Sequence, residues 1–256
     1  MVVTGTYSPP VGERFTGARV VVTGGARGIG TAIARSFAAQ GASIAVVDRL
    51  ADECHAVADE VSGIAVTCDL ADPAETTAAM QTAIGRLGGV DVLVNNAGVF
   101  RITPLLDISA DEWDWIFSIN TRAMRLTTQV AARSMIAAGR GGKIVNMASM
   151  GGKLGAAGQA HYAASKAAVI SLTQVSATEL GPHGINVNSI CPGYVLTEMG
   201  ADSRTPEMIA AWSAKSPLGR LAEPSDVANM ALFLASHDAD YLTGQAFNVT
   251  GGMMMR

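Results

Sequence analysis

The chain has 256 residues, of which 49% are hydrophobic and 16% charged; this composition suits one large α/β domain with an aliphatic core and excludes an intrinsically disordered chain. The formal net charge of -4 argues against a nucleic-acid partner, and the apolar runs are too short and too often broken by glycine or charge to span a membrane. Cys54, Cys68 and Cys191 lie far apart in no metal-ligand spacing, so we expect no metal site, no structural disulfide and a cytoplasmic location.

Residues 1–16 are polar and contain Pro9, Pro10 and scattered glycines. They lack the basic start and the apolar stretch of a signal peptide. We therefore expect a loose N-terminal arm over residues 1–16, followed by a single domain over residues 17–256.

Short runs rich in β-branched residues alternate with longer helical stretches along this domain. In chain order we predict a strand at 18–23, a helix at 28–40, a strand at 43–48, a helix at 51–61, a strand at 64–68, a helix at 73–87, a strand at 90–94, a long helix at 111–138, a strand at 143–147, a helix at 159–180, a strand at 186–190 and a strand at 246–249. The strands are apolar throughout, as expected when helices cover both faces of a parallel sheet. The alternation predicts a doubly wound α/β fold with seven parallel strands in one domain.

One segment breaks this rhythm, from about residue 194 to about residue 224, with a short helix of its own near 206–214. Ligands of doubly wound sheets bind beyond the carboxyl ends of the strands. Long insertions at that edge tend to be functional, which favours a lid over substrate. The alternative is an ordinary surface excursion.

The first strand leads into a glycine-rich turn, Thr-Gly-Gly-Ala-Arg-Gly-Ile-Gly at residues 23–30, where a helix begins. Glycines allow a tight turn and close approach to a pyrophosphate, and the helix start presents free N–H groups to that anion. The position at the first strand–helix junction favours dinucleotide binding over a turn needed only for packing. The turn residues predicted to contact the cofactor are Gly24, Arg27, Gly28, Ile29 and Gly30.

Asp48 ends the second strand, near the spacing expected for a carboxylate that binds the adenosine ribose. Such a carboxylate accepts from the ribose hydroxyls and repels a 2′-phosphate, which favours NAD over NADP. Arg27 and Arg49 argue the other way, because either could pair with a phosphate. A strand-end helix cap is the structural alternative for Asp48.

Further cofactor contacts are predicted at the ends of the third and fourth strands. Asp69, with Leu70 beside it, could accept from the adenine amino group. Asn96, Ala97 and Gly98 combine an amide with small residues, so the backbone could run close to the cofactor.

Tyr162 and Lys166 lie one turn apart on one face of the predicted helix at 159–180. Removing hydride from an alcohol carbon needs a base for the hydroxyl proton, and free Tyr has a pKa of about 10. Lowering that pKa by about 3 units requires about 4 kcal/mol. One ammonium at about 4 Å supplies roughly that much at an effective dielectric of about 20. In isolation, the pair would instead be read as an amphipathic helix with an exposed Lys and a half-buried Tyr.

Two further polar residues support the catalytic interpretation. The hydroxyl of Ser149, which follows the fifth strand, can hold the substrate oxygen beside the Tyr162 hydroxyl. Asn120 is unusual inside a helix, where Asn competes with the backbone. We expect Asn120 to open the helix locally and to hold a water that relays protons to Lys166.

Together these motifs resemble the short-chain dehydrogenase/reductase family, in its shorter type, over residues 17 to 252. The resemblance rests on the turn at 23–30, the residues from Asn95 to Gly98, Pro192-Gly193 and the four catalytic candidates Asn120, Ser149, Tyr162 and Lys166. It implies a Rossmann-like fold with seven parallel strands and a homotetramer or homodimer.

The resemblance also assigns cofactor contacts. It implies that Lys166 bonds the nicotinamide ribose and that Pro192, Gly193, Val195 and Thr197 border the nicotinamide carboxamide. Thr250 departs from the family pattern, which often has Asp before the two final glycines; this concerns the C-terminal packing rather than the chemistry.

The substrate wall is predicted among residues of mixed apolar and amide character near Tyr162. These are Met150, Gly151, Leu154, Gln159 and Tyr194, with the loop at 194–224. Lys153, Arg204 and Lys215 are either handles for an anionic group or plain surface, and His161 is interpreted as structural. The stretch at 139–149 resembles sugar-alcohol and secondary-alcohol dehydrogenases within the family.

The leading hypothesis is therefore hydride transfer between NAD(H) and a small-molecule secondary alcohol or ketone, such as a polyol, a sugar or a cyclic alcohol. The first alternative is a 3-oxoacyl-thioester reductase that uses NADPH and an acyl carrier protein. The second is a non-catalytic protein that senses dinucleotides on the same fold.

Overall fold

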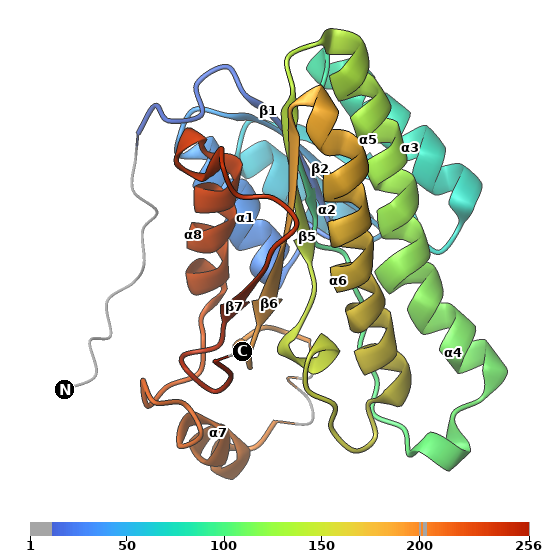
Figure 1. Cartoon of the computed structure of the whole chain (residues 1–256), viewed down its shortest axis with the longest axis vertical. Coiled ribbons are helices and arrows are strands. Elements are labelled where there is room, and N and C mark those ends of the chain that lie inside the picture. The colour runs from blue at the N-terminus through green and yellow to red at the C-terminus, as the bar shows by residue number, and fades with distance from the viewer. Residues whose placement is uncertain (1–11, 200, 202–203, 256) are drawn as a thin grey trace.

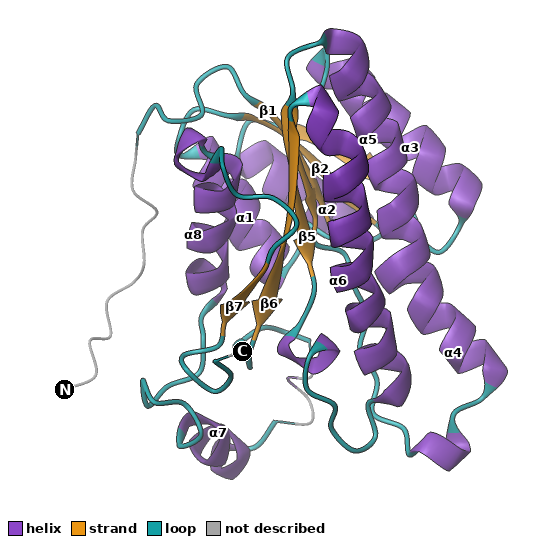
Figure 2. Cartoon of the chain, in the orientation of Figure 1, coloured by secondary structure: helices purple, strands orange, loops and turns teal. Residues whose placement is uncertain are grey.

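In the computed structural model, which describes residues 12–199, 201 and 204–255, the chain forms a seven-stranded, wholly parallel sheet in the order β3-β2-β1-β4-β5-β6-β7. Figure 2 shows the strands as one layer between two layers of helices. The strands are β1 (Arg19–Thr23), β2 (Ser43–Asp48), β3 (Ile64–Thr67), β4 (Val92–Asn95), β5 (Gly142–Met147), β6 (Ile185–Pro192) and β7 (Ala246–Val249). The predicted fold class is confirmed.

Apolar side chains on alternate residues of each strand enter two separate cores. In β1, Val20 and Val22 belong to one hydrophobic cluster and Val21 to the other. Strand β4 divides in the same way, with Val94 on the first face and Leu93 on the second. This two-sided burial explains why the strands are apolar runs without alternation.

Helices cover both faces of the sheet (Figure 1). Residues of α1, α2 and α8 enter the first cluster, and residues of α3, α5 and α6 contribute to the second. The α-helices are α1 (Gly28–Ala38), α2 (Ala51–Glu60), α3 (Pro73–Leu87), α4 (Ala110–Phe117), α5 (Met124–Ala138), α6 (Ala160–Leu180), α7 (Pro206–Ser213) and α8 (Pro224–Ala235). Among the described residues, no helix is both long and apolar enough to cross a membrane.

The helix predicted at 111–138 is interrupted. Residues Ser118–Ala123 form a π-helical segment between α4 and α5, and Asn120 lies in its centre. The backbone thus departs from the regular α-helix at Asn120, where the sequence predicts a local opening. Such π-bulges are rare in α-helices and often occur at functional sites.

Helix α8 is absent from the predicted elements, although its start carries recognisable signals. Pro224 occupies the first turn, and the side chains of Glu223 and Asp226 form a reciprocal capping box. The parallel pairing of β6 with β7 requires a crossover connection. Helix α8 provides that connection and packs against α1.

Residues 12–16 of the expected arm are packed, while residues 1–11 lie outside the described part of the chain. Phe15 is buried and meets Phe37 of α1 edge to face, with ring centroids 4.8 Å apart. The backbone N–H groups of Gly12 and Phe15 donate to Ala39 and Gln40. Phe15 thus belongs to the first hydrophobic core.

The strand order reverses direction between β1 and β4, which lie side by side at the middle of the sheet. A crevice beyond the carboxyl ends of such strands is the usual ligand position in doubly wound sheets. In Figure 1 this edge is at the bottom, where α6 begins and where α7 lies.

Candidate active site

The glycine-rich turn after β1 leaves no room for larger side chains. Gly24 has φ +62°, and a Cβ added there would lie 2.6 Å from the Cα of Ala97. A Cβ on Gly30 would lie 2.0 Å from the carbonyl oxygen of Gly24 and 2.6 Å from Asn96 Nδ2. The turn therefore packs directly against the end of β4, as a cradle for a pyrophosphate requires.

Asn96 fastens the end of β4 to this turn. Its Nδ2 donates to the carbonyl oxygens of Thr23 at 3.1 Å and Gly24 at 2.8 Å. The Thr23 hydroxyl oxygen accepts from the backbone N–H groups of Asn96 and Ala97. The Asn96 amide thus shapes the cradle by binding protein backbone.

Asp48 also bonds the glycine-rich turn. Its Oδ2 accepts from the N–H of Ala26 at 3.0 Å, and its Oδ1 accepts from the N–H of Leu50 at 3.1 Å. Arg27, the cationic residue of the turn, forms an ion pair with Glu53 of α2, whereas the Arg49 side chain is exposed. The carboxylate of Asp48 is therefore ordered at the end of β2, beside the N-terminus of α1.

The two residues predicted at the adenine side differ in exposure. Asp69 is exposed, and its Oδ1 accepts from the N–H of Ala71 at 2.9 Å. Leu70 is buried in the second hydrophobic cluster, and its carbonyl oxygen accepts from the Thr76 hydroxyl. Of these two residues, Asp69 is thus the one whose side chain is accessible.

Asn120 is fully buried and uses its whole side-chain amide. Its Oδ1 accepts from the N–H of Val99 at 2.7 Å, and its Nδ2 donates to the Val99 carbonyl and to Ser165 Oγ, both at 3.0 Å. A Cβ on Gly98 would lie 3.2 Å from Asn120 Oδ1 and equally far from Lys166 Nζ. Asn120 and Lys166 therefore flank the same glycine after β4.

Tyr162 lies in the first turn of α6 with its ring half-buried. The ring meets Phe100 edge to face, with centroids 4.8 Å apart. The Ser149 side chain acts to lower the pKa of the Tyr162 hydroxyl, and Ser149 Oγ accepts from the N–H of Gly151 at 3.0 Å. A Cβ on Gly151 would lie 3.4 Å from Ser149 Oγ and 3.3 Å from Tyr162 Cε1, so the two side chains are neighbours beyond β5.

Lys166 is 3% exposed, and its Nζ donates to the carbonyl oxygen of Met147 at 2.8 Å. Burial lowers the pKa of Lys166 to about 8. The Lys166 Nζ lies 6.0 Å from the centroid of the Tyr162 ring. The amine is thus placed beneath the Tyr162 ring by a backbone carbonyl at the end of β5.

The expected lowering of the Tyr162 pKa by Lys166 does not appear in the chain by itself. Burial raises the pKa of Tyr162, and the hydrogen bond with Ser149 opposes that rise only in part. The cost of burying the phenolate has the opposite sign to the attraction of a single ammonium at about 4 Å.

The segment after β6 comes close to the glycine-rich turn. A Cβ on Gly28 would lie 3.1 Å from Thr197 Cγ2, so Thr197 stands beside the start of α1. Gly193 donates its N–H to Val249, and Val195 forms an isolated bridge with Ala222. Pro192 ends β6 itself. These contacts hold the 192–197 segment near the carboxyl end of the sheet.

Thr250, where the sequence departs from the family pattern, closes the C-terminal turn. Its hydroxyl donates to the carbonyl of Met254 at 3.1 Å, and the residue is buried. Thr250, which stands where the family often has Asp, therefore still makes a polar contact within the turn.

The residues of the predicted substrate wall differ in exposure. Met150 and Gly151 are half-buried, and Gln159 precedes α6. Leu154 is 58% exposed. Tyr194 stacks flat on Trp212 of α7, with centroids 4.5 Å apart and an interplanar angle of 4°. This stack attaches α7 to the segment that follows β6.

Two of the three cations considered as anion handles have structural partners. Lys153 Nζ donates to the Ala246 carbonyl and to Asn248 Oδ1, both at 2.8 Å. Arg204 donates to the carbonyls of Thr197 and Met199. Both side chains tie loops to the fold, whereas Lys215 is exposed.

Sequence reasoning missed two neighbours of Tyr162. Phe100 carried no recognisable signal, because a lone aromatic after a strand has many explanations. Glu112 lies three residues after Ser109, which caps α4, and its position alone indicates an ordinary first-turn acid. In the structure Glu112 instead binds the buried ring of His161, which agrees with the structural role predicted for His161.

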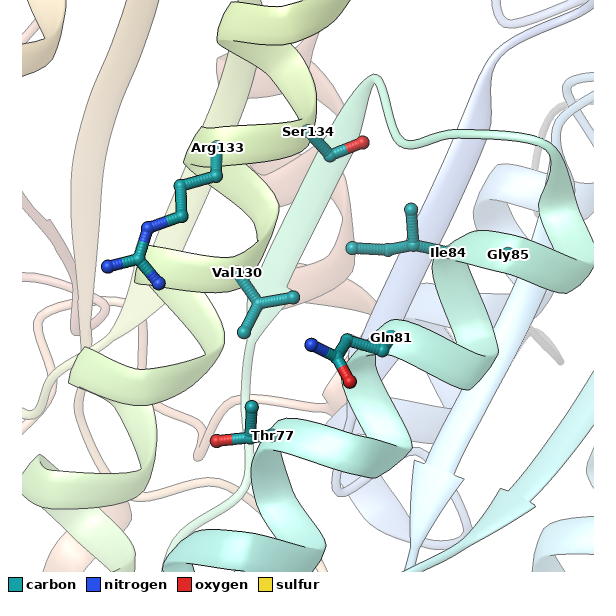
Figure 3. Close-up of a pocket in the computed structure, with 7 residues that line it drawn as sticks. All are labelled: Thr77, Gln81, Ile84, Gly85, Val130, Arg133 and Ser134. Carbon is teal, nitrogen blue, oxygen red and sulfur yellow. The ribbon is translucent and has the colours of Figure 1, made fainter.

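A surface depression lies on the helix layer, between α3 and α5, and not at this edge of the sheet. Figure 3 shows its lining residues, which come from both helices. They are Thr77, Gln81, Ile84, Gly85, Val130, Arg133 and Ser134.

The described residues fit a dinucleotide in both halves of the site. The turn at 23–30 and Ala97 form a backbone cradle that a Cβ on Gly24 or Gly30 would fill, and Asp48 stands at the end of the adjacent strand. Tyr162, Ser149 and Lys166 lie at the other side of the strand-order reversal, beyond β5. The fold and this donor set together define the class of nicotinamide-dependent oxidoreductases with a doubly wound sheet.

Comparison with known proteins gives the family. A family model described as Enoyl-(Acyl carrier protein) reductase matches residues 24–254. The chain is 40% identical over 254 residues to sorbitol dehydrogenase of Cereibacter sphaeroides, covering 94% of this chain and 99% of that protein. It is 39% identical over 247 residues to galactitol 2-dehydrogenase of Agrobacterium fabrum, covering 92% and 96%.

A solved structure agrees with these relatives. The crystal structure of a short-chain type dehydrogenase/reductase from Mycobacterium marinum superposes with a TM-score of 0.89 at 37% identity, covering 94% of this chain and 97% of that one. The chain belongs to the short-chain dehydrogenase/reductase family and is an oxidoreductase that acts on CH–OH groups.

Proposed function

We propose that this enzyme transfers a hydride between NAD(H) and a secondary alcohol or ketone of the polyol, sugar or cyclic alcohol class. The observation that carries the proposal is that Ser149 Oγ and the Tyr162 ring both border Gly151, next to the buried amine of Lys166. The names of the sorbitol and galactitol dehydrogenases support the polyol class.

In the proposed reaction, Tyr162 takes the hydroxyl proton of the alcohol, or returns it to the ketone, while Ser149 holds the same oxygen. NAD, when bound, supplies the hydride acceptor. Lys166 stabilises the phenolate of Tyr162 and binds the nicotinamide ribose. General-base assistance of this kind typically contributes about 10²- to 10⁴-fold in rate.

Asn120 completes the proposed proton path. Its Oδ1 and the Lys166 amine flank Gly98, which leaves the two polar groups on either side of one small residue. A water held there would relay protons between Lys166 and the surface. The π-helical segment at 118–123 supports this role, because it frees the backbone from the regular helical pattern.

The cofactor contacts are proposed at the residues predicted from the sequence. The pyrophosphate would lie on the turn from Gly24 to Gly30, and the ribose hydroxyls would bond Asp48. Asp69 with Leu70, the segment from Asn96 to Gly98, and the segment from Pro192 to Thr197 would border the adenine and nicotinamide ends. The contacts of Asp48 Oδ2 and of Thr197 with the turn support this arrangement.

The preference for NAD over NADP rests on two charges. The carboxylate of Asp48 would repel a 2′-phosphate, and Glu53 already neutralises Arg27, the cation nearest to the turn. The direct test is catalytic efficiency with both cofactors over a panel of polyols, secondary alcohols and their ketones. A clear preference for NADP would contradict the proposed cofactor.

Tyr162→Phe tests the chemistry separately from the binding. The hydroxyl is lost while the ring and its contact with Phe100 remain. We expect cofactor affinity within about twofold of the parent and a loss of turnover of at least about 10³-fold, the scale of general acid–base catalysis. Near-normal turnover would end the proposed role of Tyr162, and a protein that binds NAD but oxidises nothing on the panel would favour the dinucleotide-sensing alternative.

A second candidate is the reduction of a 3-oxoacyl thioester on an acyl carrier protein with NADPH. The description of the matching family model also names an acyl carrier protein, although for an enoyl group, in which a C=C bond and not a carbonyl is reduced. That reaction calls for a basic docking surface, which the formal net charge of -4 does not favour. The same panel, extended by an acyl thioester with NADPH, separates the two candidates.

We propose that the 194–224 loop closes over substrate as a lid. The flat stack of Tyr194 on Trp212 connects α7 to the segment bordering the site and supports this role. Trp212→Ala is expected to raise KM for the alcohol by about fivefold, because a loosened lid excludes water less well. The dissociation constant of NAD should stay within about twofold, and an unchanged KM would contradict the lid.

We propose that the enzyme assembles as a homotetramer or homodimer in the cytoplasm. The adjacent, exposed apolar side chains of Leu105 and Leu106 support an assembly, because contiguous apolar surface often marks an interface between proteins. The three free and buried cysteines support a reducing location. Light scattering at micromolar concentration measures the oligomeric state, and a monomer would contradict the proposal.

A further inference from the structure

Glu112 and His161 form a buried polar pair beside Tyr162 that the proposed chemistry does not use. His161 immediately precedes Tyr162 in the first turn of α6 and is 0% exposed. Its Nε2 lies 2.8 Å from Glu112 Oε1, and the Glu112 side chain is 13% exposed. A polar pair in such a position is costly unless it is hydrogen-bonded, so its contacts determine what it does.

The direction of the hydrogen bond follows from the state of Glu112. The hydrogen bond from Thr103, and then those of His161 and the charge of Arg101, hold the pKa of Glu112 below its ordinary value. Glu112 is thus a carboxylate and can only accept, so His161 Nε2 donates. His161 Nδ1 is buried without a partner among the described residues. Among the described residues, Glu112 is therefore the only polar partner of the His161 ring.

Glu112 also holds the segment that bears Phe100. The Thr103 hydroxyl donates to Glu112 Oε1 at 2.5 Å, and Arg101 Nη1 lies 3.6 Å from Glu112 Oε2. The Thr103 N–H donates to the Gly158 carbonyl at 2.9 Å, just before α6. One carboxylate thus joins α4, the first turn of α6 and the 100–103 segment.

Two of these elements bear on Tyr162 directly: the 100–103 segment carries Phe100, and the first turn of α6 carries Tyr162 itself. Phe100 meets one edge of the ring, and Gly151 approaches another, since a Cβ there would lie 3.3 Å from Tyr162 Cε1. The backbone of Tyr162 follows directly from His161. A shift of either the 100–103 segment or the first turn of α6 would therefore move the Tyr162 hydroxyl relative to Ser149.

On the basis of the proposed function, we propose that Glu112 is a positioning residue that acts through His161 and Thr103 to place the Tyr162 hydroxyl for proton transfer. Neither Glu112 nor His161 exchanges a proton with substrate. Their effect is on geometry, where a displacement of about 1 Å can cost about 10²-fold in rate.

The primary test compares two substitutions of His161. His161→Gln keeps an N–H donor near the position of Nε2 and can still bond Glu112, whereas His161→Leu cannot. We expect kcat to fall at least tenfold in His161→Leu, with the dissociation constant of NAD within about twofold, and to stay within about threefold of the parent in His161→Gln. An unchanged kcat in His161→Leu, or equal losses in both variants, would overturn the proposal.

Glu112→Gln is the second variant, should His161→Leu fail to fold. The amide keeps one acceptor oxygen but loses the charge that attracts His161, Thr103 and Arg101. We expect kcat to fall about three- to tenfold while KM for the alcohol changes less than twofold. An unchanged kcat would overturn the proposal.

Asp91→Asn is the matched control for a merely structural loss. Asp91 forms a comparable, partly buried ion pair with Arg19 at 2.7 Å, but it precedes β4 at the opposite edge of the sheet. We expect a lower Tm with kcat within about twofold. If Asp91→Asn lowers kcat as much as His161→Leu at an equal change in Tm, the effect is structural and the positioning role is wrong.

Tyr162→Phe, alone and combined with His161→Leu, distinguishes a failure of the proposed function from a failure of the positioning role. If Tyr162→Phe keeps near-normal turnover, the proposed function fails, and with it the basis of the positioning role. If Tyr162→Phe abolishes turnover while His161→Leu leaves it normal, only the positioning role fails. If the residual rate of Tyr162→Phe falls no further when His161→Leu is added, the two residues act through one group, as proposed.

Discussion

The carboxylate of Asp48 accepts a hydrogen bond from the backbone N–H of Ala26 at 3.0 Å. The residue proposed to recognise the adenosine ribose is thus attached to the turn proposed to bind the pyrophosphate. The contact fixes the negative charge of Asp48 close to the N-terminus of α1, where a helix dipole stabilises an anion. Cofactor discrimination and the shape of the phosphate cradle therefore depend on one side chain.

Asp48→Asn separates these two roles. The amide oxygen can still accept from Ala26, but the side chain no longer repels a 2′-phosphate. Because like-charge juxtaposition costs several kcal/mol, we expect kcat/KM with NADP to rise by about tenfold or more, and kcat/KM with NAD to fall. Steady-state kinetics with both cofactors measures the change, and an unaltered ratio would show that Asp48 does not face the ribose.

Glu53→Gln should act in the same direction and more weakly. Glu53 pairs with Arg27, and both side chains are largely exposed, at 39% and 53%. Exposed pairs are worth about 0–1 kcal/mol, so freeing Arg27 to meet a 2′-phosphate should raise kcat/KM with NADP by no more than about fivefold. The gain should shrink at high salt, since exposed charges are screened.

The Arg35–Glu60 pair provides the control for Glu53→Gln. It joins α1 to α2, with comparable exposure and a distance of 2.7 Å, but it lies at the far end of α2 from the turn. Glu60→Gln should leave the ratio of NADP to NAD efficiency unchanged. An equal effect of both substitutions would mean that net charge, and not Arg27, determines the ratio.

Asn120→Asp tests the π-helical segment. Aspartate keeps the acceptor for the Val99 N–H but cannot donate to the Val99 carbonyl or to Ser165 Oγ, and it introduces a buried charge into a fully buried position. We expect kcat to fall at least tenfold and stability to fall by about 2 kcal/mol or more, the scale of a buried polar group that loses its partners. Turnover and urea unfolding measure the two effects. Parent-like turnover would exclude Asn120 from the proton path.

The pattern of short apolar runs predicted all seven strands, because each strand is buried on both faces and its residues cannot alternate. The spacing of Tyr162 and Lys166 predicted one shared helix face, and both residues lie on α6. Boundaries moved by a few residues, as for β6, which extends to Pro192, since strand ends depend on pairing with neighbours.

Features that depend on tertiary contact were not predictable in this way. The bond between Glu112 and His161 joins residues 49 positions apart on α4 and α6, and no local pattern encodes it. The packing of Phe15 on Phe37 likewise requires the N-terminal segment to return to α1.

The pKa of Tyr162 depends on burial, which no spacing rule contains, so its direction was predicted wrongly for the chain by itself. Helix α8 was different, because its capping signals were present and overlooked.

Lys166→Met should separate stability from catalysis. Burial lowers the pKa of Lys166 from its ordinary 10.5 to about 8, which corresponds to about 3 kcal/mol at about 1.4 kcal/mol per pKa unit. Because the folded pKa lies below the unfolded one, the cost of burying the charged amine is fully present below pH 8. It disappears as the pH rises from about 8 towards 10.5, where the folded chain has already released the proton.

Methionine removes this cost but also removes the hydrogen bond to the Met147 carbonyl, which is worth about 1 kcal/mol. We therefore expect Lys166→Met to be about 2 kcal/mol more stable than the parent at pH 7, and to lose this advantage near pH 10. Turnover should be abolished at both pH values. Urea unfolding at the two pH values measures the difference. A variant less stable than the parent at pH 7 would show that burial of the charged Lys166 amine does not lower the stability of the folded enzyme. A gain in stability with a loss of turnover would identify Lys166 as a residue retained for chemistry at the expense of the fold.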